Sequence, residues 1–298
     1  MEFETAHNDL LSREDARALR VQSDARGTVH LLVHLLCLAI AVLLNAASFS
    51  FLTFFATMLQ GVMMVTLFAP LHETVHRTAF ADREINDWVG RLIGLILFLP
   101  AGYFRQFHFA HHRYTQVPGK DPELALTKPK NKVDYVVWMS GLHYWQSQVV
   151  YLLSASFGRL DADFISYKRR DDVILEARIH VAIYLVMFVV MPIFGVWGAY
   201  WFWLFPLFLG QPFLRAYLFA EHGGLEETGD LLVNTRTVIT NPVVRFLMWN
   251  MPYHTEHHIY PAVPFHLLPK LHEQIEKHLR FVDNGYIEFH REFWRELD

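Results

Sequence analysis

The residues most able to do chemistry in this 298-residue sequence are its histidines, of which there are 18. Eight of them fall in three short clusters, which read His72-Glu-Thr-Val-His76, His108-Phe-Ala-His111-His112 and His254-Thr-Glu-His257-His258. On a helix, positions i, i+3 and i+4 share a face, so each cluster is expected to point its imidazoles one way. At this histidine content an HxxxH pair is expected about once by chance, but an HxxHH triple only about 0.06 times. Two such triples therefore indicate a functional site and not a chance pattern.

The chemistry that this pattern favours is metal binding. Neutral imidazole is a good ligand for iron, copper, nickel and zinc, whereas carboxylate-rich sites suit magnesium, calcium or manganese. Eight histidines exceed what one tetrahedral metal can use, and His222 in Ala220-Glu-His-Gly-Gly224 is a ninth candidate. Two metals with four or five ligands each would use them all. A two-metal site beside the apolar segments described next suggests oxidation of an alkyl chain. Because zinc has no redox chemistry, we expect the metal to be iron.

Two long apolar runs must position these clusters. Val29 to Leu71 is 43 residues without Asp, Glu, Lys or Arg, and Ile179 to Leu214 is 36 more. One membrane-spanning helix needs about 20 residues, so each run is about two crossings long, and buried core helices of a soluble protein fit such lengths poorly. We therefore predict an all-α integral membrane fold with four transmembrane helices in two hairpins, capped by a cytoplasmic helical domain carrying the histidines. The predicted crossings are 29–47 with 49–71, broken at Asn45–Ser50, and 177–195 with 198–219, broken at Gly195–Gly198.

The basic residues set the expected orientation. Residues 1–28 hold four Arg, 72–177 hold thirteen Lys or Arg, and 221–298 hold seven, whereas neither hairpin tip holds any. Basic residues stay on the cytoplasmic side. We expect a multi-pass protein with a cytoplasmic catalytic face, in the inner membrane if the source is bacterial, and we see no cleavable signal peptide in residues 1–27. The expected segments are cytoplasmic 1–28, hairpin 29–71, cytoplasmic 72–176, hairpin 177–219 and cytoplasmic 220–298.

Three shorter stretches are expected to lie beside the membrane or on the cytoplasmic side. Leu92 to Gly102 is eleven residues long, too short to span, so we place it in the interface plane or against the protein. Residues 135–157 are aromatic and apolar but carry polar groups, which predicts one further interfacial helix. Near the C-terminus, Leu268, Leu271, Ile275 and Leu279 form the apolar stripe of an amphipathic helix.

Composition excludes several other classes of protein. Hydrophobic residues make up 53% of the chain and charged residues 19%, which excludes disorder. The single cysteine, Cys37, excludes a disulfide framework and a cysteine-based zinc site. A net charge of −4 gives no sign of nucleic-acid binding.

The three clusters resemble the three histidine boxes of the membrane-bound fatty acid desaturases, in a superfamily that also includes alkane hydroxylases and carotenoid ketolases. The flanking segments Asn250-Met-Pro-Tyr-His254 and Tyr260-Pro-Ala-Val-Pro264 are similar too, and the resemblance covers roughly residues 45–270. It implies two iron ions, O2 as co-substrate, and a desaturase that introduces a double bond into a fatty-acyl or lipid-like chain. The alternative on the same scaffold is a hydroxylase, ketolase or oxidative decarboxylase of a lipid or hydrocarbon.

The resemblance also implies roles for individual residues. Box three begins with His254, not with the Gln typical of front-end desaturases, and we expect no fused cytochrome b5 domain. Electrons should then come from a separate donor of the ferredoxin, rubredoxin or cytochrome b5 type with its reductase. The catalytic metal ligands implied are His72, His76, His108, His111, His112, His254, His257 and His258, with His222 as a further metal ligand that matches an additional family histidine.

Two rival functions stay open at this point. The first box is also HExxH, the pattern of zinc metalloproteases, which would make Glu73 the general base and leave both HxxHH triples idle. A non-catalytic haem or metal protein would instead use His30, His34 or His180 in the apolar runs. We interpret these three as interfacial side chains whose polar tips reach water.

The acidic residues near the clusters and the other histidines can be interpreted without a direct role in metal binding. Glu73, Glu221 and Glu256 either orient imidazoles or lie on a solvated face. Asp121 and Glu123 follow box two in a proline-rich loop and are candidates to pair with Arg83 or Arg105. We interpret the other histidines as structural, namely His7, His143, His266, His272, His278 and His290.

Overall fold

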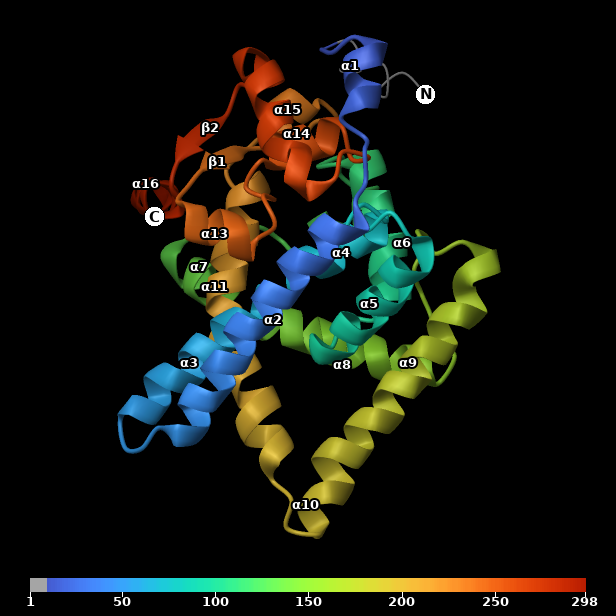
Figure 1. Cartoon of the computed structure of the whole chain (residues 1–298), viewed down its shortest axis with the longest axis vertical. Helices are drawn as coiled ribbons and strands as arrows, with labels where there is room; N and C mark the ends of the chain where they lie inside the picture. The colour runs from blue at the N-terminus through green and yellow to red at the C-terminus, as the bar shows by residue number, and fades with distance from the viewer. Residues whose placement is uncertain (1–9) are drawn as a thin grey trace.

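The computed structural model describes residues 10–298, which form a mostly helical protein with one two-stranded parallel sheet (Figure 1). The N-terminal half contains α1 (Arg13–Ala18), α2 (Asp24–Ala47), α3 (Leu52–Val65), α4 (Phe68–His76), α5 (Arg83–Ile96), α6 (Ala101–Tyr114), α7 (Lys132–Met139) and α8 (Leu142–Ser156). The C-terminal half contains α9 (Arg170–Leu185), α10 (Met191–Ile193), α11 (Phe205–His222), α12 (Leu231–Asn234), β1 (Thr237–Ile239), α13 (Pro242–Leu247), α14 (His254–Ile259), α15 (Leu268–Ile275), β2 (Val282–Asn284) and α16 (Tyr286–Glu296).

The first apolar run folds back on itself at the predicted break. α2 ends at Ala47 and α3 begins at Leu52. The Nδ2 of Asn45 donates to Oε1 of Gln60 at 2.8 Å, and Thr57 donates its hydroxyl to Oδ1 of Asn45 at 2.9 Å. Gln60 in turn donates to the carbonyl of Phe202 at 2.7 Å. This buried network joins both helices to the second apolar run, as polar groups in a membrane-embedded bundle require.

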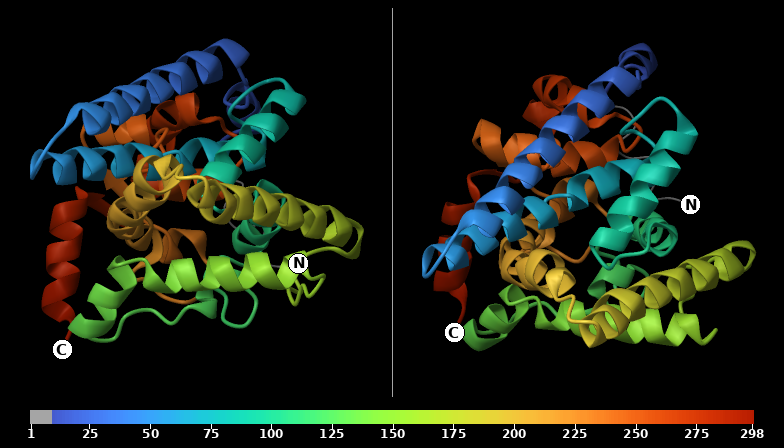
Figure 2. Two further views of the ribbon diagram at one scale, coloured as in Figure 1. Left: turned by 90° about the horizontal axis from the view of Figure 1, so that it is seen from below. Right: turned by 60° about the horizontal axis from the view of Figure 1, so that its bottom comes forward.

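The second apolar run turns where predicted, but its two helices do not pack as a close pair. α9 continues through a π-helical turn (Val186–Val190) into α10, and the chain returns through Tyr200–Leu204 into α11. α9 packs on α8, whereas α11 packs on α3, and the two diverge from their common turn (Figures 1 and 2). A Cβ on Gly61 would lie 2.1 Å from the carbonyl oxygen of Pro206, so the close approach of α3 to α11 depends on glycine.

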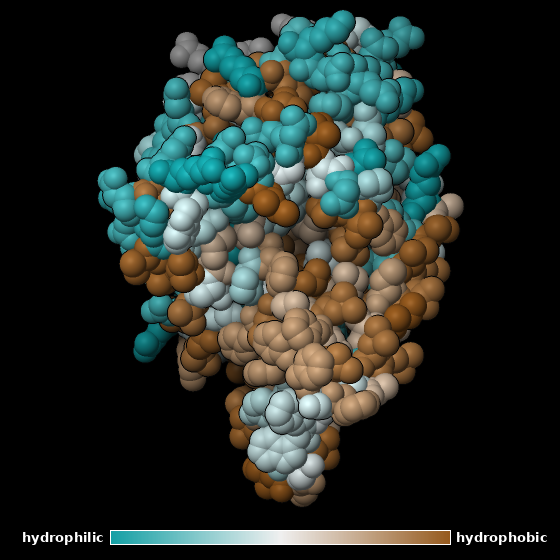
Figure 3. All heavy atoms as spheres, turned by 90° about the vertical axis from the view of Figure 1, so that its left-hand side faces the viewer, coloured by the Kyte–Doolittle hydropathy of each residue, from teal (hydrophilic) through white to brown (hydrophobic). Residues whose placement is uncertain are grey.

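Three of the four predicted crossings correspond to helices long and apolar enough to span a membrane: Asp24–Ala47, Leu52–His76 and Tyr167–Ile193. The fourth prediction, 198–219, is not among them, and its sequence contains Gln211 and Arg215. By length and composition, the described residues contain three helices that could cross a membrane, or four if the bent pair of α5 and α6 is counted as one span. Apolar side chains gather toward the end of the molecule that holds these helices, and polar ones toward the opposite end (Figure 3).

The two stretches predicted to lie in the interface are more broken than expected. The segment 92–102 is not one element, since α5 ends at Ile96 and α6 leaves at an angle of 101°. Gly94 permits this reversal, because a Cβ there would lie 2.6 Å from the carbonyl oxygen of Leu99. Residues 135–157 form parts of two helices, α7 and α8, and not one. The break falls at Gly141, whose φ of +75° suits glycine.

The C-terminal region closes over the histidine-bearing helices. β1 pairs with β2 in parallel, with Thr237 opposite Val282. In α15, Leu268, Leu271 and Ile275 are buried as predicted, but the helix ends before Leu279. The predicted terminal histidine His7 lies outside the described residues.

Candidate metal centre

Box one lies on α4, a continuation of α3 after a short break. Helix α4 ends after His76 because Arg77 adopts a left-handed conformation, with a φ of +61°. The guanidinium of Arg77 donates to both carboxylate oxygens of Asp87 on α5, at 2.9 and 2.8 Å. A bidentate pair of this kind fixes orientation as well as position. The end of α4 that carries box one is therefore anchored to α5.

Box two lies on α6 and box three on α14, both helical as the spacing predicts. All six residues of α14 are buried, including the three histidines. Glu256 of α14 accepts a hydrogen bond from the hydroxyl of Thr237 on β1 and contacts Nδ1 of His272 on α15. Through Glu256, the helix that carries the third box is therefore attached to both β1 and α15.

The structure brings all nine predicted histidines together in two separate groups. Within each group, one potential ligand atom per residue lies within 4.8 Å of the others. The five-histidine group consists of His72, His76, His108, His112 and His257. The four-histidine group consists of His111, His222, His254 and His258. Box two supplies both groups, with His108 and His112 in one and His111 in the other.

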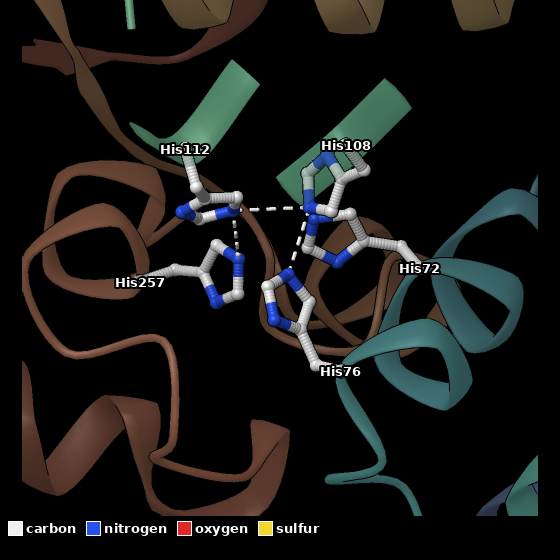
Figure 4. Close-up of side chains that lie close together, drawn as sticks. All are labelled: His72, His76, His108, His112 and His257. Atoms are coloured by element: carbon white, nitrogen blue, oxygen red, sulfur yellow. Dashed lines mark hydrogen bonds between the residues drawn. The ribbon is translucent and has the colours of Figure 1, made fainter. Parts of the chain in front are cut away.

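In the five-histidine group the Nε2 atoms converge on one point (Figure 4). The Nε2 of His108 lies 2.8 Å from that of His76 and 3.0 Å from that of His112. The Nε2 of His112 lies 3.1 Å from that of His257. The Nδ1 atoms of His72, His112 and His257 are buried and have no hydrogen-bond partner among the described residues.

In the four-histidine group three of the four Nδ1 atoms form hydrogen bonds, and that of His254 lies beside a carboxylate without forming one. The Nδ1 of His222 lies 2.8 Å from the carbonyl oxygen of Asn234, and that of His111 lies 3.0 Å from a carboxylate oxygen of Asp121. The contacts of the other two rings are 3.2 Å from His254 Nδ1 to Oε1 of Glu221 and 3.2 Å from His258 Nδ1 to Oγ1 of Thr115. Partners of this type fix the tautomer and the orientation of metal-bound imidazoles.

For two of these rings the partner determines which nitrogen has a free lone pair. The carbonyl oxygen of Asn234 can only accept, so Nδ1 of His222 carries the proton and its Nε2 carries the lone pair. The hydroxyl of Thr115 donates to the carbonyl of His111 at 2.9 Å, so its oxygen is left to accept from His258. Burial would lower the pKa of His111, but Glu123 and Asp121 raise it to about 9. The Nε2 atoms of His254 and His222 lie 3.0 Å apart, with the lone pair of His222 facing inward. Such an arrangement fits a cation between them.

The histidines of box three are prepared for metal binding by their surroundings. Burial, reinforced by neighbouring imidazoles, holds the pKa of His254, His257 and His258 well below the ordinary value of 6.5. Neutral imidazole is the form that binds a metal ion. An all-imidazole donor set of this size fits iron better than the oxygen-preferring cations.

The acidic residues of the loop after box two serve the four-histidine group and not an arginine. Glu123 lies 3.0 Å from Nδ1 of His111, beside Asp121. Burial would raise the pKa of Asp121, but His111 together with the backbone N–H groups of Glu123 and Gln116 lowers it. Burial raises the pKa of Glu123. Neither predicted arginine is the partner, and Arg105 lies 3.9 Å from Asp87 instead.

The three glutamates beside the boxes are all buried, so a solvated face is excluded for each of them. Only Glu221 contacts a histidine of the two groups. Oε2 of Glu73 accepts hydrogen bonds from the hydroxyl of Thr78 at 2.8 Å and the backbone N–H of Phe265 at 3.1 Å. Glu73 does not line the cavity described below, so it cannot act there as the base of a metalloprotease.

The other described histidines lie outside both groups. His34 contacts the hydroxyl of Thr66 at 3.1 Å, and His290 contacts Tyr135 at 2.6 Å. His272 is held by Glu256. These contacts agree with the interpretation of His272 and His290 as structural, whereas His34 and His180 are buried, so the prediction that their polar tips reach water is wrong.

A cavity of about 1290 Å³ reaches both groups, touching His72 and His108 of the first and His111 and His254 of the second. Beyond the histidines it has an apolar portion and a polar portion. The apolar lining includes Phe68, Leu99, Phe104, Phe107, Met248 and Met251, and the polar lining includes Tyr144, Gln148, Arg215, Tyr217 and Glu221.

Sequence reasoning missed Thr115 and Asn234 and assigned the wrong partners to Asp121 and Glu123. Both Thr115 and Asn234 are buried, and the side chain of Asn234 donates to the carbonyl of Thr115 at 2.8 Å. Thr115 lies four residues after His111, so its helical spacing was a usable signal. Nothing local marks Asn234, because it reaches the site through its backbone carbonyl.

Comparison with known proteins agrees with this geometry. The profile of the fatty acid desaturase family matches residues 47–290, and the chain belongs to that family. It is 25% identical over 238 residues to the sn-1 oleoyl-lipid 12-desaturase of Picosynechococcus sp., covering 74% of this chain and 67% of the relative. It is 24% identical over 241 residues to the sphingolipid delta(4)-desaturase/C4-monooxygenase of Rattus norvegicus, covering 76% and 67%. The sn-1 oleoyl-lipid 12-desaturase of Arthrospira platensis is 22% identical over 227 residues, covering 70% of this chain and 64% of the relative.

Family membership makes the chain an oxidoreductase of the desaturase or hydroxylase kind, with histidine groups compatible with metal binding and several apolar helices. The zinc metalloprotease reading is therefore wrong.

Proposed function

We propose that this protein is a membrane-bound, O2-dependent desaturase that introduces a double bond into a fatty-acyl or lipid-like chain. The observation that carries the proposal is the convergence of nine histidines in two groups that open onto one cavity. The five-histidine group and the four-histidine group would each hold one iron ion. When bound, the two irons would supply O2 activation and the one-electron steps that remove hydrogen from an unactivated C–H bond.

The residues of the chain do the positioning in this proposal. The Nε2 atoms present lone pairs to the metals, and their Nδ1 partners in the four-histidine group keep those rings from rotating. The apolar part of the cavity, including Phe68, Phe104 and Met251, would hold the alkyl chain against the histidines. Binding the chain there excludes water, which protects reactive intermediates from side reactions.

The proposal extends to partners and orientation. The two electrons would come from a separate donor of the ferredoxin, rubredoxin or cytochrome b5 type with its reductase. Support for a cytoplasmic catalytic face comes from the basic residues, which lie outside the predicted hairpin tips. The substrate would be a lipid or acyl compound that enters from the membrane.

Hydroxylation is the second candidate reaction, with ketolation and oxidative decarboxylation as further chemistries of the same scaffold. One relative, from Rattus norvegicus, is named for both a desaturase and a monooxygenase activity. Both outcomes begin with removal of one hydrogen and differ in whether a second hydrogen or an oxygen follows. The placement of the alkyl carbon relative to the metals decides between them.

Expression in a host followed by mass spectrometry of total lipids tests the proposal. Products lighter by two hydrogens support desaturation, and products heavier by one oxygen support hydroxylation. His257→Ala should abolish either product while the protein stays in the membrane. His143→Ala, at an exposed histidine outside both groups, is the matched control. Absence of any altered lipid despite a bound electron donor and two irons per chain would contradict the proposal.

A further inference from the structure

The cavity contains a polar patch that the metal chemistry does not use. Arg215 of α11 and Gln148 of α8 both line it. The Nε of Arg215 and the Oε1 of Gln148 are buried and have no hydrogen-bond partner among the described residues. Gln148 is only 9% exposed. A buried donor or acceptor left without a partner costs free energy, so both atoms are suited to meet a ligand.

The packing of α8 against α11 fixes this patch in place. The guanidinium of Arg215 lies 4.5 Å from the ring centroid of Tyr144, and the rings of Trp145 and Phe208 lie 4.5 Å apart. Tyr144 donates its hydroxyl to the carbonyl of Leu97 at 3.2 Å. The aromatic ring therefore holds the arginine over the cavity while leaving Nε free.

No carboxylate of the described residues forms a salt bridge with Arg215, although Glu123 and Glu221 act on it from a distance. A buried guanidinium nitrogen without a partner is costly to keep, which favours a role in meeting a polar ligand.

We propose that Arg215 and Gln148 bind a carbonyl or carboxylate oxygen of the substrate inside the cavity, so that the enzyme selects acyl compounds over plain hydrocarbons. This inference rests on the proposed function, because the ligand is the substrate of that same site. Arg215 lies seven residues before His222 on α11, or about 10 Å along the helix axis. A residue that binds the substrate oxygen and a ligand of the four-histidine group therefore lie on one helix about two turns apart, which would limit the distance from that oxygen to the reacting carbon.

Binding by the purified, metal-loaded protein in detergent tests this inference without turnover. The probes are an alkane, a fatty acid and a fatty amide of equal chain length, with affinity measured by ligand-induced thermal stabilisation. The wild type should bind the acid, the amide or both about 10- to 100-fold more tightly than the alkane. A preference for the acid identifies a carboxylate, and an equal or greater affinity for the amide identifies a neutral carbonyl.

Arg215→Met should abolish the preference and leave alkane affinity and metal content unchanged, and Gln148→Leu should weaken it. Arg291→Met, at an exposed arginine on α16, is the matched control. Equal affinity of the wild type for alkane and acyl probes would overturn the inference. So would a uniform loss for all probes in both variants, which indicates a structural role. If the protein converts lipids in the host but binds acyl and alkane probes equally, only the inference about Arg215 and Gln148 is overturned. If it prefers acyl probes but converts no lipid, only the proposed function is overturned.

Discussion

The two histidine groups differ in how the protein holds them. In the four-histidine group three Nδ1 atoms form hydrogen bonds, with Asp121, Thr115 and the carbonyl of Asn234, and that of His254 lies 3.2 Å from Glu221 without a hydrogen bond. In the five-histidine group three Nδ1 atoms are buried without such a partner. The first arrangement depends on hydrogen bonds around the ligands, and the second on the number of ligands and the packing of their helices.

Ligand number and hydrogen bonds around the ligands are thus two ways of holding a metal ion. Four coordinating groups complete a tetrahedral site, so the five-histidine group has one to spare. The four-histidine group has no spare ligand. Hydrogen bonds to the ligands typically contribute about 10- to 100-fold in metal affinity. Four experiments probe the contrast, in order of decreasing expected effect.

Removing one ligand from each group should have the largest effect. His258→Ala leaves three histidines in its group, whereas His257→Ala leaves four. We expect both variants to lose activity, but His258→Ala to lose about one metal ion per chain and His257→Ala to retain more of its metal. Elemental analysis of the purified proteins measures this, with His143→Ala as control. Equal metal loss in the two variants would break the comparison.

Changing the partners of the four-histidine group should have the next largest effect. Glu221→Gln and Asp121→Asn should each lower metal affinity there by roughly 10- to 100-fold, because the imidazole orientation is less well fixed. Competition with a chelator followed by elemental analysis measures the loss, which should be confined to one of the two metals. Glu288→Gln, at an exposed glutamate, should leave both metals in place. Loss of both metals together would show that the groups are not independent.

Metal removal should destabilise the protein by a smaller but measurable amount. The cations bind the folded protein, in which the histidines are brought together, so their removal lowers the stability of the folded state. We expect the melting temperature in detergent to fall on chelation and to recover on addition of ferrous iron. The shift should be smaller for His258→Ala than for the wild type, and an identical shift in both would contradict a metal in the four-histidine group.

The smallest expected effect is the pH dependence of the metal-free protein. The pKa values of His254, His257 and His258 are lowered from 6.5 by burial and by neighbouring imidazoles. Below pH 6.5 the unfolded chain therefore binds more protons than the folded one, and stability falls as the pH falls. Thermal unfolding of the apoprotein, measured from about pH 7 down to about pH 5, should show this decline in stability. Metal-loaded protein should show less of it, because bound metal competes with protons.

The sequence predicted the histidine boxes well because their signal is local. An i, i+3, i+4 spacing on a helix needs no tertiary information, so His108, His111 and His112 could be placed on one face of α6. The apolar runs and their breaks were equally readable, since a hydrocarbon layer imposes a length of about 20 residues. The number of crossings was not, because the predicted crossing 198–219, which contains Gln211 and Arg215, is not among the helices apolar enough to span a membrane.

The partners of the histidines could not be predicted because they come from distant parts of the chain. Asp121 and Glu123 were visible in the loop after box two, yet either could have paired with an arginine. Asn234 acts through a backbone carbonyl, which leaves no trace in the residue type. The single helix predicted over 135–157 failed for a different reason, since Gly141 allows a left-handed turn that periodicity does not register.

Spacing and composition were enough to identify the nine histidines, the three boxes that hold eight of them and the apolar segments beside them. The division of the boxes between two groups, with His111 in a different group from His108 and His112, follows from how the helices pack. A helix face carries several side chains in slightly different directions, and the elements packed around it decide which neighbour each one meets. The same packing of α8 against α11 placed Arg215 and Gln148 on the cavity, where their free polar atoms define what the site accepts.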